Sequence, residues 1–296
     1  MGIEGKSPNV DQAFAWEGWR NQNAALVIAH PGHELRVHHW LEQARPLVFT
    51  LTDGSGHTGS SRLASTEAVL ERAGARPSTF FGRMSDGELY AAILGKKSVR
   101  FRELIQEIAC ALESAKIELV VGDAVEGFNP GHDICRLLIN AALSEIRKST
   151  GRVLHNFEFP LERLCLHNRP VGTADSIILN LDEDAFARKL QAAESYPELK
   201  HELSRIRAAL GPSSFRVELL SRVHYELDIS GCFEHPPEYE LWGEKRVREG
   251  HYSQVLRYRE HMAPLAEELL LGECAEASKS LERSKRVRFP SVGYRR

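Results

Sequence analysis

A short apolar run that ends abruptly in polar residues is the feature that most restricts how this chain can fold. The run begins at Ala24, reads Ala-Ala-Leu-Val-Ile-Ala, and continues directly into His-Pro-Gly-His-Glu. A run of small and branched apolar residues of this length is typical of a strand buried on both faces of a parallel sheet. His30, His33 and Glu34 then lie in the loop at the carboxyl end of the strand, where ligands bind in open α/β sheets.

Strand-like and helix-like segments alternate through about residue 160. The expected strands are Ala25–Ala29, Leu47–Leu51, Ser78–Phe81, Glu118–Val121 and Val153–Phe157. Between them, apolar residues recur with a helical period within residues 37–44, 101–115 and 134–141. This alternation favours βαβ units with right-handed crossovers. We therefore expect an α/β fold with a Rossmann-like, mostly parallel sheet flanked by helices, followed by a C-terminal α+β extension.

The second half of the chain has a less regular pattern. One long amphipathic helix is expected over Leu181–Leu210, with Pro197 as the candidate break, strands over Phe215–Leu227, a proline-containing loop over Glu234–Trp242, and a last helix over Val255–Leu271. The predicted organisation is an N-terminal segment (1–23), a Rossmann-like core (24–180), an extension that completes the domain (181–272) and a basic tail (273–296).

Composition narrows the classes of function. The 296 residues suffice for one large domain, and a formal net charge of −3 gives no reason to expect binding to nucleic acid or a membrane. No run approaches the roughly 18 apolar residues that span a bilayer, and the polar N-terminus lacks a signal-peptide core. The 5 cysteines are scattered and never form a Cys-x-x-Cys pair, which favours reduced thiols in the cytoplasm. We expect a small-molecule substrate, and the sequence leaves the oligomeric state open.

Two loops share a pattern that suits a metal site. Imidazoles are common zinc ligands, and a catalytic site needs about three protein ligands with one open position. His30 and His33 supply two, and His132 in Asn-Pro-Gly-His-Asp supplies a third from a loop between a strand and a helix. A purely structural interpretation exists, because Asn-Pro and Pro-Gly are ordinary turn dipeptides and Asp133 can cap a helix.

A glycine-rich loop follows the second expected strand, from Thr52 to Gly59, and reaches the same edge of the sheet. Asp53 in this loop could orient a metal-bound histidine, but an Asp-Gly turn explains the same residues and is favoured. Asp53 and the nearby Arg62 are our candidate substrate-binding residues.

With these segments in place, the chain resembles the PIG-L/LmbE family of metal-dependent N-acetylglucosaminyl deacetylases. The family signatures are Ala-His-Pro-Asp-Asp-Glu after a strand, Thr-Asp-Gly after the next strand, and His-Pro-Asp-His before a helix. This chain has Ala29-His30-Pro31-Gly32-His33-Glu34, Thr52-Asp53-Gly54 and Asn129-Pro130-Gly131-His132, within a match over residues 24–160, and Leu181–Tyr196 resembles a lysine-containing helix further on. The resemblance implies a Rossmann-like fold and metal ligation by His30, His33 and His132, with His33 in place of an aspartate ligand.

The chain departs from the family where protons are handled. Gly32 stands in place of the aspartate that serves as general base, and Asn129 in place of a histidine implicated in stabilising the tetrahedral intermediate. Glu34 and Asp133 each follow a proposed ligand and are candidate replacements for the base. Asn129 keeps a donor that could polarise a carbonyl.

Three hypotheses follow. The first is a metal-dependent hydrolase, with zinc as the expected metal, that removes an acyl group from a polar or sugar-like amide. The second keeps the metal and changes the reaction, since three histidines also suit iron, copper or nickel. The third is a catalytically silent binding protein that retains the pocket.

Overall fold

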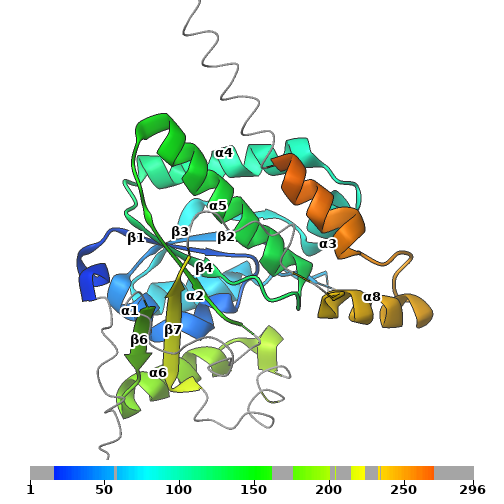
Figure 1. The fold of residues 1–296 in the computed structure, drawn as a ribbon. Helices are drawn as coiled ribbons and strands as arrows, with labels where there is room; N and C mark the ends of the chain where they lie inside the picture. The colour runs from blue at the N-terminus through cyan, green and yellow to red at the C-terminus, as the bar shows by residue number, and fades with distance from the viewer. Residues whose placement is uncertain are drawn as a thin grey trace, which may run out of the picture.

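A seven-stranded sheet forms the centre of the molecule, in the order β3-β2-β1-β4-β5-β7-β6 (Figure 1). The computed structural model describes residues 17–56, 59–161, 176–200, 204, 215–223, 233 and 235–269. The strands are β1 (Ala24–Ile28), β2 (Leu47–Thr52), β3 (Arg76–Met84), β4 (Leu119–Asp123), β5 (His155–Phe159), β6 (Ser176–Asn180) and β7 (Val217–Arg222). Strands β1 to β5 pair in parallel, whereas β7 runs antiparallel to both β5 and β6. The expected mostly parallel sheet with an α+β extension is confirmed.

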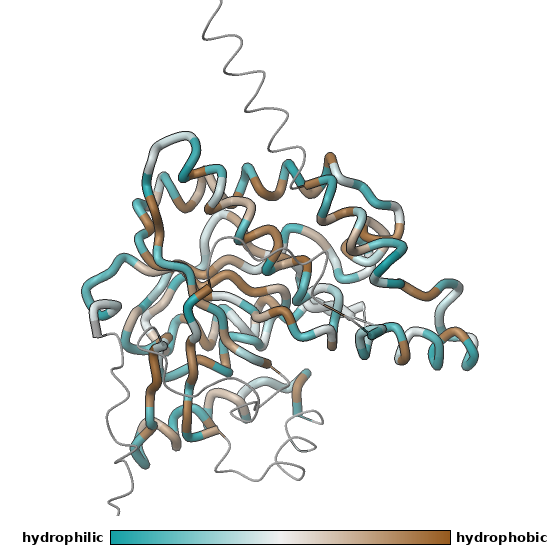
Figure 2. Tube along the Cα trace, in the orientation of Figure 1, coloured by the Kyte–Doolittle hydropathy of each residue, from teal (hydrophilic) through white to brown (hydrophobic). Residues whose placement is uncertain are grey.

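Helices cover both faces of the sheet (Figure 1). The α-helices whose two ends both lie within the described residues are α1 (His38–Ala44), α2 (Leu63–Ala73), α3 (Asp86–Leu94), α4 (Ser98–Ser114), α5 (Pro130–Thr150), α6 (Glu183–Glu194) and α8 (Glu238–Arg248), of which α8 projects to the side of the sheet. One apolar layer joins the sheet to α1, α2 and α6, and the other joins it to α3, α4, α5 and the helical residues 258–269. Figure 2 shows hydrophobic residues running through the central strands and recurring along the helices around them.

The five strands expected in the first half correspond to β1–β5, with ends shifted by a few residues. All five residues of β1 are buried, which agrees with its uninterrupted apolar run. The last expected helix is found as a π-helical turn, Tyr258–Met262, that continues into helical residues 263–269.

The helix expected over Leu181–Leu210 is interrupted at the candidate break. Helix α6 ends at Glu194 and Pro197 begins a short 3-10 helix, Pro197–Leu199, because proline cannot supply the N–H that a helix interior requires. Residues 201–203 and 205–210 lie outside the described residues. One expectation for the second half is corrected. The expected loop over Glu234–Trp242 contains the start of α8. Pro237 is the N-cap of that helix, and Glu238 lies in its first turn, where a negative charge is favourable.

The terminal segments are only partly described. Residues 1–16 and the whole basic tail, 273–296, lie outside the described residues. Trp19 of the 3-10 helix Glu17–Asn21 is buried in the apolar layer between the sheet and helices α1 and α2. The proposed boundaries between segments stay predictions.

The strand order creates a switch point between β1 and β4. The chain leaves β1 toward β2 and β3 on one side, whereas β4 leads to β5 on the other. Ligands of doubly wound sheets bind beyond the carboxyl ends of the strands at such a point. His30 follows β1 there, and Asp123 ends β4 beside it.

No helix among the described residues has the length and apolarity to cross a membrane.

Candidate active site

Three histidines meet at the switch point. His30 follows β1, His33 opens the 3-10 helix His33–Val37, and His132 lies in the first turn of α5. The ring centroids are 5.3 Å apart for His30 and His33, 5.4 Å for His30 and His132, and 4.6 Å for His33 and His132. The structure therefore brings together the three residues that the sequence suggested as metal ligands.

Two glycines make this convergence possible. Gly32 has φ of +107°, a conformation that L side chains rarely adopt, and it turns the chain between His30 and His33. A Cβ on Gly131 would lie 2.7 Å from Nε2 of His30, so only glycine allows α5 to approach this closely. Asn129 caps α5 by accepting a hydrogen bond from Gly131 N–H at 2.7 Å, which fixes the start of the helix.

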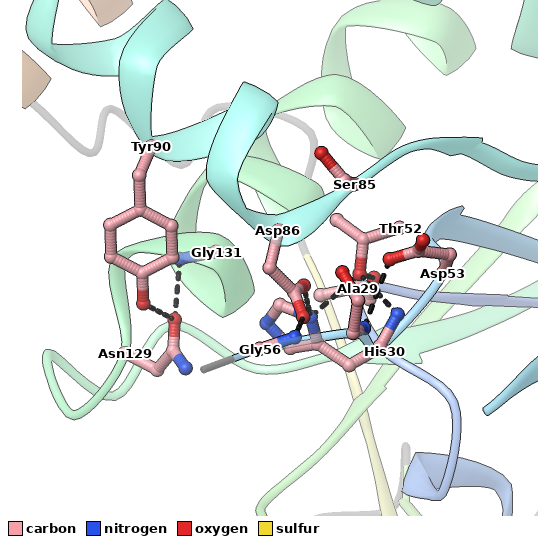
Figure 3. Close-up of polar contacts among 12 residues, drawn as sticks. Ala29, His30, Thr52, Asp53, Gly56, Ser85, Asp86, Tyr90, Asn129 and Gly131 are labelled. Atoms are coloured by element: carbon pink, nitrogen blue, oxygen red, sulfur yellow. Dashed lines mark hydrogen bonds and ion pairs between the residues drawn. The ribbon is translucent and has the colours of Figure 1, made fainter. Parts of the chain in front are cut away.

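Nδ1 of His30 has two oxygen neighbours, Thr52 Oγ1 and Asp86 Oδ1, each at 2.8 Å (Figure 3). The Thr52 contact has the geometry of a hydrogen bond. Asp86 Oδ1 has no hydrogen-bond partner among the described residues, so despite its short distance we treat this contact as electrostatic. On the other side of the ring, Nε2 is buried without a partner in the described part of the chain.

His33 is backed by a carboxylate in the same way. Its Nδ1 lies 3.0 Å from both oxygens of Asp123, the last residue of β4. Asp123 is fully buried, and its Oδ2 also accepts the Ala29 N–H at 2.7 Å. Carboxylates behind metal-binding histidines fix the ring orientation and the tautomer, and this leaves Nε2 as the ligand atom.

His132 is buried, and its Nδ1 has no hydrogen-bond partner among the described residues. Burial, followed by the neighbouring His33 and His30, holds the pKa of His132 well below its usual value. The neutral imidazole that results is the form that binds a metal.

The spacing of the rings fits a shared metal ion. Three imidazoles bound tetrahedrally at a Zn–N distance of about 2.0 Å have ring centroids about 5 Å apart. Among the described residues, no group of three or more His, Cys, Asp or Glu side chains has its donor atoms already placed to hold a metal ion. His132, whose Nδ1 has no hydrogen-bond partner among the described residues, can rotate about its Cβ–Cγ bond, which moves its ring nitrogens much more than its ring centroid.

The two candidate bases are each tied to the backbone through one oxygen. Oε2 of the fully buried Glu34 accepts the Gly32 N–H at 2.8 Å, whereas Oε1 has no partner among the described residues. Oδ1 of Asp133 accepts the N–H groups of Glu126 and Gly127 at 3.0 and 3.3 Å, and Oδ2 is similarly without a partner in the described chain. Burial raises the pKa of Glu34, and it raises the pKa of Asp133 to about 7.

Asn129 is held in one orientation. Its Oδ1 accepts both Gly131 N–H and the Tyr90 hydroxyl, the latter at 3.1 Å (Figure 3). A backbone N–H can only donate, so the atom facing Gly131 is the oxygen, and Nδ2 remains as a donor.

In the glycine-rich loop after β2, Asp53 forms the turn that the sequence favoured. Asp53 Oδ1 accepts the Ser55 N–H at 2.9 Å, as in an Asx turn. Arg62 is the N-cap residue of α2, and its Cδ would be 3.2 Å from a Cβ on Gly54, so this side chain lies over the loop. The substrate-binding roles of Asp53 and Arg62 stay predictions.

Sequence reasoning missed Asp86 and Asp123. Both lie at the carboxyl ends of parallel strands, Asp123 as the last residue of β4 and Asp86 at the start of α3 after β3. Burial alone would raise the pKa of Asp86, but His30 and the Gly56 N–H hold it well below its usual value. An acidic residue at the end of an apolar strand is the signal that could have identified Asp123, whereas β3 before Asp86 is too polar to give one.

No protein-family model and no curated protein sequence matches the chain. Among solved structures, an A40926 pseudoaglycone deacetylase is 17% identical, with 69% of this chain and 98% of that one covered and a TM-score of 0.49. A zinc-inhibited form of a teicoplanin deacetylase is 13% identical, with coverage of 68% and 99% and a TM-score of 0.44. A deacetylase–teicoplanin complex is 15% identical, with coverage of 68% and 100% and a TM-score of 0.43.

Proposed function

We propose that this protein is a metal-dependent amide hydrolase of the deacetylase type, which acts on an N-acylated, polar or sugar-like small molecule. The observation that carries the proposal is the cluster of His30, His33 and His132, with ring centroids 4.6 to 5.4 Å apart. Carboxylates behind His30 and His33 support it, because this is the environment of histidines that bind metals.

The histidines would hold the metal, with zinc as the proposed ion. Unpartnered buried nitrogens on His30 and His132 fit this role, since a buried polar atom without a partner is costly unless a ligand satisfies it. A bound zinc ion supplies Lewis-acid chemistry, which polarises an acyl carbonyl and makes water a stronger acid. Because all three side-chain donors are neutral, none of them reduces the charge of the ion.

Asn129 is the proposed donor to the acyl oxygen. Gly131 N–H and the Tyr90 hydroxyl occupy its Oδ1, so the amide is held with Nδ2 as the donating end. A preorganised donor of this kind favours the charge that develops on the oxygen during attack and is worth about 10²–10³ in rate.

Glu34 and Asp133 remain the two proposed general bases. Each keeps one carboxylate oxygen without a partner among the described residues, and each is adjacent in sequence to a proposed ligand. Loss of a general base lowers the rate by about 10²–10⁴-fold. Parallel assays of Glu34→Gln and Asp133→Asn identify the base, because the change at the other carboxylate leaves proton transfer intact.

The motif pattern supports the substrate class. The chain keeps the order and spacing of the three PIG-L/LmbE signatures, and the substrate of that family is an N-acetylated sugar. Asp53 and Arg62 are proposed to contact the substrate from the glycine loop and the start of α2.

One observation favours a second candidate function, recognition of the same ligand without hydrolysis. Leu199 packs against Gly32, the position where the family has its base, with Cδ1 2.6 Å from the place of a Cβ. An apolar wall at this position removes a proton acceptor but leaves a binding pocket intact.

Release of acetate from N-acetylated amino sugars tests the proposal. We expect zinc-loaded wild type to release acetate and His132→Ala to lose this activity. The control His251→Ala should keep it, because the His251 side chain is exposed beside Glu249. Saturable sugar binding without acetate release would contradict hydrolysis and favour recognition. Tightly bound iron or copper in place of zinc would favour the non-hydrolytic metalloenzyme.

A further inference from the structure

Asp86 has no place in the sequence motifs, yet its carboxylate lies directly behind a proposed metal ligand. We propose that Asp86 is a positioning residue for His30. Together with Thr52, it holds the imidazole in the tautomer that carries its proton on Nδ1 and leaves Nε2 as a bare electron pair. The tautomer stands on the contacts of these residues alone, and only its consequence for metal binding rests on the proposed function.

Thr52 contributes an oxygen that can only accept from His30. Its hydroxyl donates to the Ala29 carbonyl at 3.1 Å, so its single hydrogen is already used. The lone pairs of Oγ1 therefore face Nδ1 of His30 at 2.8 Å and the Gly54 N–H at 3.3 Å. A hydroxyl with one hydrogen and two acceptor sites is fully used by these contacts, and the proton of the His30 contact comes from the ring.

Asp86 imposes the same requirement through its charge. Its Oδ2 accepts the Gly56 N–H, and its Oδ1 lies 2.8 Å from Nδ1 of His30. An ionised carboxylate has only acceptor sites, so a bare ring nitrogen at this distance would place two electron pairs against each other. A proton on Nδ1 removes the repulsion.

The start of α3 fixes the carboxylate of Asp86 beside His30. It lies in the first turn of α3, directly after the N-cap Ser85, which forms a capping box with Glu88. The positive end of the helix dipole favours the ionised carboxylate there. The carboxylate also links the glycine loop to His30, since Gly56 belongs to that loop.

The consequence falls on Nε2, the opposite nitrogen of His30. It is buried, has no partner among the described residues, and lies 2.7 Å from the place of a Cβ on Gly131, the residue before His132. With the proton held on Nδ1, this atom presents an electron pair toward the side of the ring where α5 begins.

Asp86→Asn tests the proposal with the smallest change in shape. The Gly56 N–H requires an oxygen opposite it, so the new amide nitrogen faces Nδ1 of His30. Two N–H groups would then oppose each other, and the conflict is relieved when the ring proton moves to Nε2. Replacing an aspartate by asparagine behind a histidine produces this wrong tautomer in other sites.

The measurement is the ¹⁵N spectrum of the histidine rings in metal-free, full-length protein, with His30 assigned by its loss in His30→Gln. We expect a protonated Nδ1 and an unprotonated Nε2 in wild type, and a shift of the population toward protonated Nε2 in Asp86→Asn. Glu88→Gln is the matched control, because it removes the same charge from the same turn of α3. It should leave the tautomer unchanged.

The wild-type spectrum alone can overturn the proposal, so the test survives if Asp86→Asn does not fold. A proton on Nε2 in wild type contradicts it, and so does an unchanged tautomer in folded Asp86→Asn. For metal binding, chelator competition should give zinc affinity weakened about 10–100-fold in Asp86→Asn and unchanged in Glu88→Gln. A wild type with the expected tautomer and no affinity for zinc, iron, copper or nickel would contradict the proposed function and leave the tautomer assignment in place.

Discussion

Leu199 fills the space that a side chain at position 32 would need. Its Cδ1 lies 2.6 Å from the place of a Cβ on Gly32, although the two residues come from distant parts of the chain. The 3-10 helix that carries Leu199 is fastened to α2, because Ser65 donates to the Glu198 carboxylate at 2.9 and 3.0 Å. Position 32, where the PIG-L/LmbE signature has an aspartate, is therefore covered by an apolar side chain in this chain.

Introducing an aspartate at position 32 should destabilise the protein. We expect Gly32→Asp to lower the free energy of unfolding by about 1–3 kcal/mol, because it overpacks the contact with Leu199. The φ of +107° adds strain to any side chain at this position. In a Leu199→Ala background the same change should cost less, which urea unfolding of all four proteins measures as a double-mutant cycle. Equal costs in both backgrounds would contradict the steric relationship.

The buried ion pair of α6 offers a second test. Lys189 Nζ donates to Glu218 Oε1 and to the Arg36 carbonyl, each at 2.7 Å. Lys189→Met should lower the free energy of unfolding by about 3–5 kcal/mol, because it leaves a buried charge without its partner. The adjacent Arg188, whose pair with Glu42 is partly exposed, is the control, and Arg188→Ala should cost at most about 1 kcal/mol. Comparable losses of unfolding free energy in the two variants would contradict the stabilising role of the buried Lys189–Glu218 pair.

Asp133 should have a structural role that can be separated from its proposed chemical one. Asp133→Ala leaves the N–H groups of Glu126 and Gly127 without their acceptor, so we expect a loss of about 1–3 kcal/mol in stability. Asp133→Asn keeps an acceptor oxygen, so its free energy of unfolding should lie within about 1 kcal/mol of the wild-type value. If Asp133 is the base, acetate release falls in both variants; if Glu34 is, the asparagine variant keeps its activity. A stable Asp133→Ala would show that the loop does not depend on this carboxylate.

Local patterns were sufficient for the first half of the fold. The apolar runs of β1, β2 and β4 predict buried strands because each is short and uninterrupted, and parallel pairing places their carboxyl ends at one edge. His30, His33 and His132 could be grouped for the same reason. The start of α8 was misread as a loop because Pro236 and Pro237 suggest a turn, whereas a proline at the N-cap is also compatible with a helix that begins at Glu238.

What the sequence could not provide depends on contacts between distant segments. Asp86 acquires its role only because β3 ends beside the glycine loop, where Gly56 and His30 reach it from other segments. No sequence pattern around Leu199 or Gly32 predicts the contact between them. The antiparallel pairing of β7 with β5 is likewise set by tertiary packing rather than by local propensity.

The metal content of the purified protein tests the central claim most directly. Mass spectrometry should find nearly one zinc ion per wild-type chain, retained in His251→Ala and lost in His30→Ala, His33→Ala and His132→Ala. Zinc should also raise the melting temperature of wild type, since a ligand at 100 times its Kd adds about 2.7 kcal/mol of stability, and it should leave the three cluster variants unchanged. A wild type that takes up none of zinc, iron, copper or nickel after reconstitution would contradict the account.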